Sequence, residues 1–355
     1  MWVLNNETPF AAERTWTRDE TGAEIWLVAV RGTFLIEPNG RLRLAPEQQA
    51  VCRVPEFRDP AGRGSVIYES DLVRTKASTD VLLNGHAHAG PGRVATELDV
   101  TLKVGTRHKR LRVFGDRVWS RSVFGLRMSP PKAFEQMPLI YERAFGGADT
   151  AASDPALHAW EPSNPVGRGF AVQARHLDGM PAPNVEHPES PIRVWNDRPA
   201  PVGFGGVAAH WHPRVGLAGT YDGEWMKRRR PLLPLDFDPA FYQCAPADQQ
   251  VGGYLKGGER VELINLSPGG SLRFQVPRVS LNFWTRFSNG QAVNHRAVMH
   301  TLCIEPDVPR VLVTWHADLP CHHLVHKLLE TTVTVKRRIG NEGLPDAALP
   351  LLEIA

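Results

Sequence analysis

The chain of 355 residues has few cysteines, and the four it has form no C-x-x-C pair: Cys52, Cys244, Cys303 and Cys321. They lie far apart, in a sequence long enough to bury a core without cross-links. In a chain of this kind without a secretion signal, free thiols are favoured over disulfides. We therefore expect four free thiols.

Long apolar runs and a targeting segment are also missing. No run approaches the roughly 18 apolar residues of a membrane span. The first residues, MWVLNNETPFAAERTW, contain no basic stretch followed by an apolar one, as a signal peptide would. We expect a cytoplasmic protein with no membrane partner.

Charge of one sign is not in excess, because 41 basic residues stand against 38 acidic ones, for a net charge of +3. A nucleic-acid binder normally concentrates basic charge, so we expect no nucleic-acid partner. The densest basic patches, residues 107–112 and 227–230, are short and are typical of solvated strand edges or loops.

The signatures of common enzymes are missing as well. There is no G-x-S-x-G nucleophile turn. Glycine-rich stretches such as 203–206 lack the G-K-[ST] ending of a phosphate-binding loop. The paired carboxylates Glu69/Asp71 are more simply a solvated strand face. We expect no catalytic residue, no cofactor and no enzymatic activity.

Proline and glycine are abundant, with 30 and 31 residues, and they separate strand-like stretches. Residues 97–104 alternate polar and apolar with period two, Gly105-Thr106 offers a turn, and 109–114 continue an apolar face, which predicts a hairpin. Residues 25–36 are apolar on both faces, as in a central strand, and end at the turn 38–40. Further strands are predicted at 259–266, 272–276, 297–305, 311–315 and 331–335.

Residues 129–245 have few periodic runs and are rich in proline, glycine and tryptophan, and this aromatic content argues against disorder. We predict an all-β protein, sandwich- or barrel-like, with two β lobes, a loop-rich middle and few short helices. The predicted units are an N-terminal β lobe (1–128), a connecting region (129–245), a C-terminal β lobe (246–340) and a tail (341–355). A single unit over residues 2–335 is the alternative.

The most distinctive stretch is residues 225–250, WMKRRRPLLPLDFDPAFYQCAPADQQ. Pro231 and Pro234 oppose a regular helix or strand. Asp238-Pro239 offers a helix start, with a capping oxygen followed by a ring fixed at helical φ. We predict a surface loop leading into a short helical turn, and long irregular loops of this kind tend to be functional.

Two loops carry the tyrosine, tryptophan and arginine side chains that are enriched at interface hot spots. The candidate partner-binding residues are Tyr141, Arg143 and Phe145 in one loop and Trp225, Arg228, Arg229 and Phe237 in the other. The alternative is that Phe145 and Phe237 are core residues. In that case we expect the arginines to pair with Glu142 and Asp236.

One cluster could hold a metal ion, Cys321-His-His-Leu-Val-His326. In a helix, His322 and His326 would share a face at the i, i+4 spacing of zinc sites. No glutamate stands in the H-E-x-x-H position, and Pro320 leaves the local backbone undetermined. Cys321, His322, His323 and His326 are thus the ligands of an alternative hypothesis, and histidines hydrogen-bonded within a turn are the simpler interpretation.

Five segments in this order resemble a known family: 138–147 (PLIYERAFGG), 164–170 (NPVGRGF), 211–214 (WHPR), 218–222 (AGTYD) and the 225–250 stretch. The chain resembles the effector adaptors, also called effector chaperones, of bacterial type VI secretion. That family was long described as a domain of unknown function encoded beside spike and PAAR-tip genes. The resemblance covers the chain from about Trp2 to about Val335.

The resemblance implies a cytoplasmic adaptor that binds a toxic effector and helps load it onto the spike complex, a valine-glycine-repeat trimer tipped by a PAAR protein. Its partners would be the effector and the spike, and the resemblance assigns no contact residue. Two alternatives remain from the residues themselves. One is a metal-dependent hydrolase at 321–326, and the other, weaker one is a carbohydrate-binding β-sandwich.

Overall fold

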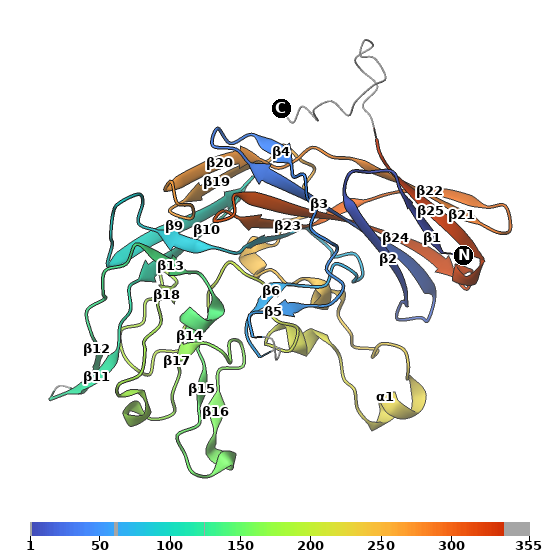
Figure 1. The fold of residues 1–355 in the computed structure, drawn as a ribbon. Coiled ribbons are helices and arrows are strands. Elements are labelled where there is room, and N and C mark those ends of the chain that lie inside the picture. Colours follow the sequence, from blue (N-terminus) through green and yellow to red (C-terminus); the bar gives the residue numbers. More distant parts are fainter. Residues whose placement is uncertain (1, 60–62, 124, 337–355) are drawn as a thin grey trace.

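The computed structural model is built from strands in three large sheets and several short ladders (Figure 1). It describes residues 2–59, 63–123 and 125–336. The six-stranded sheet runs β2 (Ala11–Arg18), β3 (Glu24–Ile36), β24 (Arg310–His322), β23 (Val298–Glu305) and β7 (Asp80–Leu83), with β4 (Leu42–Leu44) paired to β3. The five-stranded sheet runs β18 (Val185–Glu186), β10 (Arg107–Phe114), β9 (Glu97–Val104), β19 (Arg260–Ile264) and β20 (Ser271–Gln275). The four-stranded sheet runs β1 (Val3–Asn6), β25 (Leu328–Val335), β21 (Leu281–Phe287) and β22 (Ala292–Arg296).

The remaining elements are short. The two-stranded ladders are β5 (Glu56–Phe57) with β6 (Val66–Tyr68), β8 (His86–His88) with β13 (Gln136–Pro138), β11 (Trp119–Ser122) with β12 (Gly125–Met128), β14 (Phe145–Gly146) with β17 (Arg168–Gly169), and β15 (Ala148–Asp149) with β16 (Ala159–Trp160). The described residues include one short α-helix, α1 (Gly223–Arg228). Single 3-10 turns lie at Tyr141–Arg143, Pro155–Leu157, Ala174–Leu177, Arg214–Leu217, Pro239–Tyr242, Ala247–Gln249 and Val325–Lys327. No helix in the described part of the chain is long and apolar enough to cross a membrane.

The all-β prediction is confirmed, and among the described residues none of the sheets closes into a barrel. The predicted hairpin is β9–β10, joined at Gly105-Thr106. The long central strand is β3, which ends at Ile36 and returns as β4. All four cysteines are free thiols, as expected, and all four are buried.

Strands from both ends of the sequence share each large sheet. β3 pairs with β24, β9 pairs with β19, and β1 pairs with β25. The two similar hairpins β9–β10 and β19–β20 therefore lie side by side in one sheet. Each large sheet thus contains strands from both predicted β lobes. The boundaries at 128/129 and 245/246 remain a prediction about folding units.

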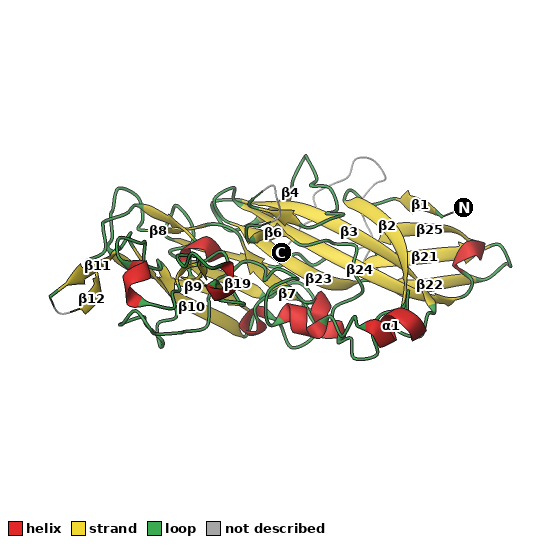
Figure 2. Ribbon diagram, turned by 90° about the horizontal axis from the view of Figure 1, so that it is seen from below, coloured by secondary structure: helices red, strands yellow, loops and turns green. Residues whose placement is uncertain are grey.

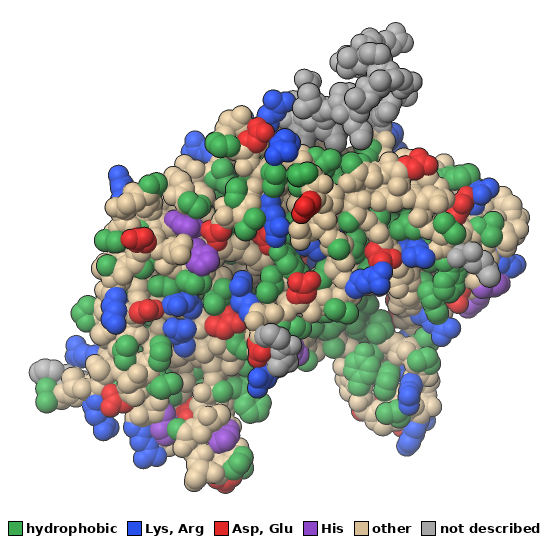
Figure 3. Space-filling view, viewed as in Figure 1, with side chains coloured by type: hydrophobic (Ala, Val, Ile, Leu, Met, Phe, Trp, Pro, Cys, Tyr) green, Lys and Arg blue, Asp and Glu red, His purple; other side chains and the backbone are tan. Residues whose placement is uncertain are grey.

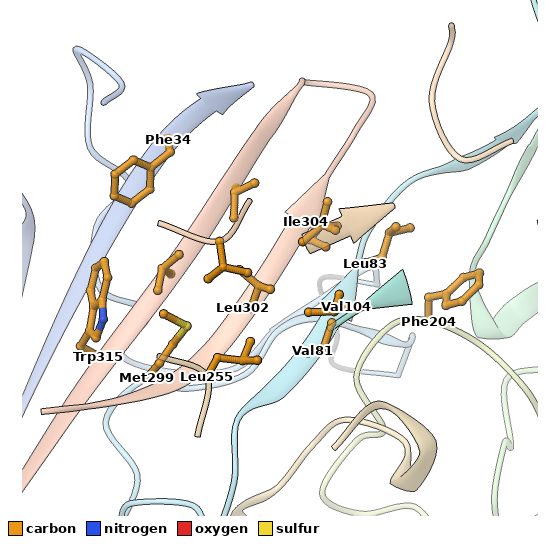
Figure 4. Close-up of a cluster of buried hydrophobic side chains, with 14 of the residues drawn as sticks. Phe34, Val81, Leu83, Val104, Phe204, Leu255, Met299, Leu302, Ile304 and Trp315 are labelled. Atoms are coloured by element: carbon orange, nitrogen blue, oxygen red, sulfur yellow. The ribbon is translucent and has the colours of Figure 1, made fainter. Parts of the chain in front are cut away.

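One face of the six-stranded sheet is apolar and packs against the two other sheets. Alternate residues such as Leu302 and Trp315 point to this face and join Val104 of β9 in one cluster (Figure 4). The indole Nε1 of Trp26 donates a hydrogen bond to Thr331 Oγ1 of β25 at 3.0 Å, which links the four-stranded sheet to the same core. Each fully buried side chain of this size contributes about 1.5–3 kcal/mol, so this cluster is the main source of stability.

The opposite face of the six-stranded sheet carries buried charged and polar side chains beside a small apolar cluster, and it is covered by loops and short helices (Figure 2). The Lys76 ammonium lies 2.7 Å from Asp80 and also donates to Thr301 Oγ1 at 3.0 Å. Arg31 pairs with Asp71 at 3.1 Å. These ions are buried, and breaking such a pair leaves a charge without compensation. The pairs therefore hold the covering loops in one position beneath the sheet.

Three elements differ from expectation. The stretch predicted to begin as an irregular loop contains α1, whereas the predicted turn at Pro239–Tyr242 is confirmed with Asp238 as its cap. The strands β21 and β22 were not predicted; residues 292–296 of β22 show no apolar alternation and are mostly exposed.

Candidate partner-binding surface

Residues 218–242 project away from the three sheets and form a segment that we call the arm (Figure 1). Its helix α1 begins after Asp222, whose Oδ1 accepts a hydrogen bond from the amide of Trp225 at 2.8 Å. This N-cap satisfies one of the free amides at a helix start. Pro231 follows the helix and cannot continue it, because it has no N–H to donate.

The two ends of the arm are joined at its base. The amide and hydroxyl of Thr220 donate to the two carboxylate oxygens of Asp236 at 2.9 and 2.7 Å, and these bonds hold the pKa of Asp236 below its ordinary value. The amide of Asp238 donates to the carbonyl of Leu217 at 3.0 Å. Gly219, at φ +80°, lies so close to the returning chain that an added Cβ would be 2.8 Å from a proline carbon. The base is therefore closed, and it requires glycine at position 219.

Within the arm, two of the predicted partner-binding residues have internal hydrogen-bond partners. Trp225 Nε1 donates to the carbonyl of Leu232 at 2.8 Å. Arg229 Nε donates to the carbonyl of Leu233 at 2.8 Å, and its Nη2 donates to the carbonyl of Glu20 in the β2–β3 turn. Trp225 and Arg229 thus hold the arm in one conformation.

The outer side chains of the arm are apolar and cationic. Tyr221, Met226 and Leu235 are 54, 55 and 86% exposed. Arg228 is also exposed and pairs only with Glu224 on the same helix, at 3.1 Å. Figure 3 shows the hydrophobic atoms of this projection facing a hollow between it and the loop-rich body, with basic side chains on its other side. The arm is the candidate surface for a partner.

The base of the arm is fixed by a buried arginine. Arg214 Nη1 lies 2.6 Å from Glu69, and its Nε donates to the carbonyl of Phe241 at 3.0 Å. Its guanidinium also lies 5.3 Å from the Phe241 ring. Phe237, another predicted binding residue, is half-buried and contacts Phe241 and Tyr242 at centroid distances of 5.7 and 5.4 Å. Phe237 thus belongs to the support of the arm.

The segments 138–147 and 164–170, which we call the motif cluster, contact one another in the interior. The buried Asn164 Nδ2 donates to the carbonyls of Tyr141 and Phe145, both at 2.8 Å. Gly146 has φ +144°, and an added Cβ would lie 2.2 Å from the carbonyl oxygen of Asn164. Glycine and asparagine are therefore needed here for close backbone packing.

The three predicted binding residues of the motif cluster are less exposed than the outer side chains of the arm. Tyr141 and Phe145 are 4 and 2% exposed, and burial raises the pKa of Tyr141 above its ordinary value. The Tyr141 ring lies edge-on to Trp211 at 5.7 Å. Arg143 is half-buried and pairs with Asp116 at 3.0 Å. The side chains of Tyr141 and Phe145 pack in the interior, and binding through this loop stays a prediction.

The predicted ion-pair partners of the arginines were wrong. Arg143 pairs with Asp116, while the carboxylate of Glu142 accepts two hydrogen bonds from Ser65, each at 2.8 Å. Asp236 accepts hydrogen bonds from Thr220. Sequence neighbours were a poor guide because each carboxylate turns toward a segment distant along the chain.

The candidate metal ligands do not converge. Cys321 is buried, whereas His322, His323 and His326 are exposed. His322 ends β24 and His326 lies in the 3-10 turn, so the helical face expected for two ligands does not form. No group of three or more His, Cys, Asp or Glu side chains in the described residues could hold a metal ion.

The structure also brings together a group of polar side chains that the sequence analysis did not predict: His86, His88 and Asp307. His86 Nδ1 and His88 Nε2 each lie 2.7 Å from a carboxylate oxygen of Asp307. The i, i+2 spacing of the histidines on a strand was visible, but their partner comes from the β23–β24 turn. Burial would raise the pKa of Asp307, yet the two imidazole hydrogen bonds hold it below its ordinary value.

The fold and this surface define an all-β protein of layered open sheets with a projecting arm. A family model described as "Uncharacterized protein conserved in bacteria (DUF2169)" matches residues 21–316, and the chain belongs to this family. The matched range includes the motif cluster and the whole arm. No curated protein and no solved structure gave a significant match.

Proposed function

We propose that this protein is a cytoplasmic adaptor that binds a type VI secretion effector and helps load it onto the spike complex. The observation that carries the binding role is the arm. It exposes Tyr221, Met226 and Leu235 on a segment whose base is closed by hydrogen bonds. The identity of the partners rests on the resemblance of the motif segments to effector adaptors.

The physical argument for the arm is the low cost of ordering it. Binding through a loop normally loses free energy when the loop becomes fixed. The cap at Asp222, the Trp225–Leu232 hydrogen bond and the Thr220–Asp236 pair already fix this segment in the free protein. Tyrosine, methionine and arginine are enriched at protein interfaces relative to the rest of the surface. A partner surface with apolar and acidic groups would complement the arm.

The motif cluster has a supporting role in this proposal. Its side chains hold the loop-rich body in shape, and that body forms the other wall of the hollow beside the arm (Figure 3). We assign the arm and the facing wall to effector binding. Spike binding would then use another surface.

The test is an affinity purification of the protein from its bacterial host, read by mass spectrometry. We expect one toxin-like protein together with spike or PAAR components. The control is the variant Tyr221→Ala/Met226→Ala/Leu235→Ala, which should fold and lose the effector. Recovery of neither partner, from cells that express a secretion apparatus, would count against the proposal.

The metal-dependent hydrolase has less support, because its cysteine is buried away from the three exposed histidines. Elemental analysis of the purified protein separates the two functions. Near-stoichiometric zinc that is lost on replacing His322 and His326 would favour the hydrolase over the adaptor.

A further inference from the structure

A second surface lies on the side of the molecule opposite the arm. The turn before β4 and the strands β9, β19 and β20 border an open groove of about 890 Å³. These elements lie at the top of Figure 1, whereas α1 lies at the bottom. The volume falls in the range of pockets that hold a drug-sized ligand, or a few residues of a peptide.

The groove is built on the outward face of the five-stranded sheet. Register places Lys103 beside Glu262, and Glu262 beside Arg273, in one row across three strands. The next residues along the strands, such as Leu102 and Leu263, are buried in the core, so this row points outward.

Positive charge dominates the groove. Its lining contains four cationic side chains and one carboxylate: Arg41, Lys103, Arg260, Arg273 and Glu262. Glu262 already accepts a hydrogen bond from Arg273 Nε at 2.8 Å. Arg41, Lys103 and Arg260 are exposed, and none of the ion pairs between described residues involves them. Three cations are thus available for an anionic ligand.

The small number of cations favours a peptide over a nucleic acid, because a nucleic-acid binder normally concentrates basic charge. The net charge of the whole chain is only +3. Leu42, Val261 and Phe274 also border the groove, but they are buried in the core and offer a ligand little apolar surface. A segment rich in carboxylates matches the three unpaired cations.

We propose that this groove binds an acidic peptide segment of a protein partner. It is a second docking surface on the side of the sheets away from the arm. Because the two surfaces share no residue, the groove can bind whether or not the arm does, and the two proposals can fail separately. If the adaptor function holds, the groove is the surface left for the second partner.

The test uses the full chain and a fluorescein-labelled peptide rich in glutamate, with binding followed by fluorescence anisotropy at low and high salt. The variant Lys103→Glu/Arg260→Glu reverses two groove charges. The variant Arg121→Glu/Arg193→Glu makes the same change in net charge at exposed positions outside the groove. We expect the groove variant to weaken binding at least tenfold and the control to change it less than twofold. Raising the salt concentration should weaken wild-type binding.

Three results would overturn the proposal. They are no binding of the peptide at low salt, an equal loss in both variants, and tighter binding of a single-stranded oligonucleotide than of the peptide. The acidic ligand could also be the chain's own C-terminal segment, which contains Glu342, Asp346 and Glu353. A chain shortened to end at Lys336 tests this. If the shortened chain binds the peptide at least tenfold more tightly, the chain's own C-terminal segment competes for the groove, and the assignment to a partner is wrong.

Discussion

The arm and the motif cluster contain similar residue types, yet the structure uses them in different ways. In the motif cluster, aromatic side chains are buried and Asn164 binds two backbone carbonyls. In the arm, the backbone is closed at its base while Tyr221, Met226 and Leu235 remain exposed. Composition alone therefore does not distinguish a binding loop from a structural one. The direction of the side chains does, and it depends on contacts with distant segments.

The largest expected effect comes from the buried support beneath the arm. Replacing Arg214 with methionine leaves the buried carboxylate of Glu69 without its ion-pair partner. We expect a loss of about 3–5 kcal/mol in the free energy of unfolding, measured by chemical denaturation. The matched change on the exposed arm, Arg228→Met, should cost less than about 0.5 kcal/mol. A loss below about 1 kcal/mol for Arg214→Met would show that this ion pair does not support the arm.

A smaller loss is expected in the motif cluster. Asn164→Ala removes the two hydrogen bonds to the carbonyls of Tyr141 and Phe145 in the interior. We expect about 1–3 kcal/mol of destabilisation by the same measurement. Leu235→Ala, at an exposed position of the arm, should change stability by less than about 0.5 kcal/mol. Similar losses at the two sites would remove the distinction between scaffold and surface.

The arm and the sheets also differ in their histidines, because the arm contains none whereas the sheets contain buried ones. Burial lowers the pKa of His300 well below its ordinary value of 6.5, and that of His295 to about 4. A histidine with a lowered pKa binds its proton more readily in the unfolded chain, so the folded state is favoured above pH 6.5 and loses stability as the pH falls toward 4.

We therefore expect the melting temperature to fall between pH 7 and pH 5, measured by circular dichroism. His300→Gln should flatten this dependence, and His323→Gln, at an exposed position, should leave it unchanged. An unchanged slope in His300→Gln would mean that other groups control the acid response.

The smallest effect on stability and the largest on binding are expected for the exposed face of the arm. The free energy of unfolding of the variant Tyr221→Ala/Met226→Ala/Leu235→Ala should lie within about 1 kcal/mol of the wild-type value. Its affinity for the partner recovered from the host should fall at least tenfold, measured by calorimetry. The control replaces three exposed apolar residues elsewhere, Val54→Ala/Leu157→Ala/Val308→Ala, and should bind like the wild type. An equal loss in the control would point to general surface hydrophobicity.

Much of the sheet structure could be predicted from the sequence, because it depends on local alternation. The hairpin β9–β10 and the long strand β3 follow from period and turn residues alone. The helix α1 was missed because Pro231 and Pro234 suggested irregular backbone, although the cap at Asp222 lay just before it.

The sites were less predictable, since they depend on segments that are far apart in the sequence. The inward direction of Tyr141 and Phe145 is set by Asn164, about twenty residues away. The cationic groove joins residues from four separate segments, none of which is a dense basic run. The partner of His86 and His88 comes from a turn more than 200 residues later.

The assignment of the arm as a binding surface can be tested by hydrogen exchange, read by mass spectrometry on the protein with and without its recovered partner. We expect the partner to slow exchange in the arm, residues 218–242, and to leave exchange in the motif cluster at 138–147 and 164–170 unchanged. Slower exchange in the motif cluster, with no change in the arm, would contradict this assignment.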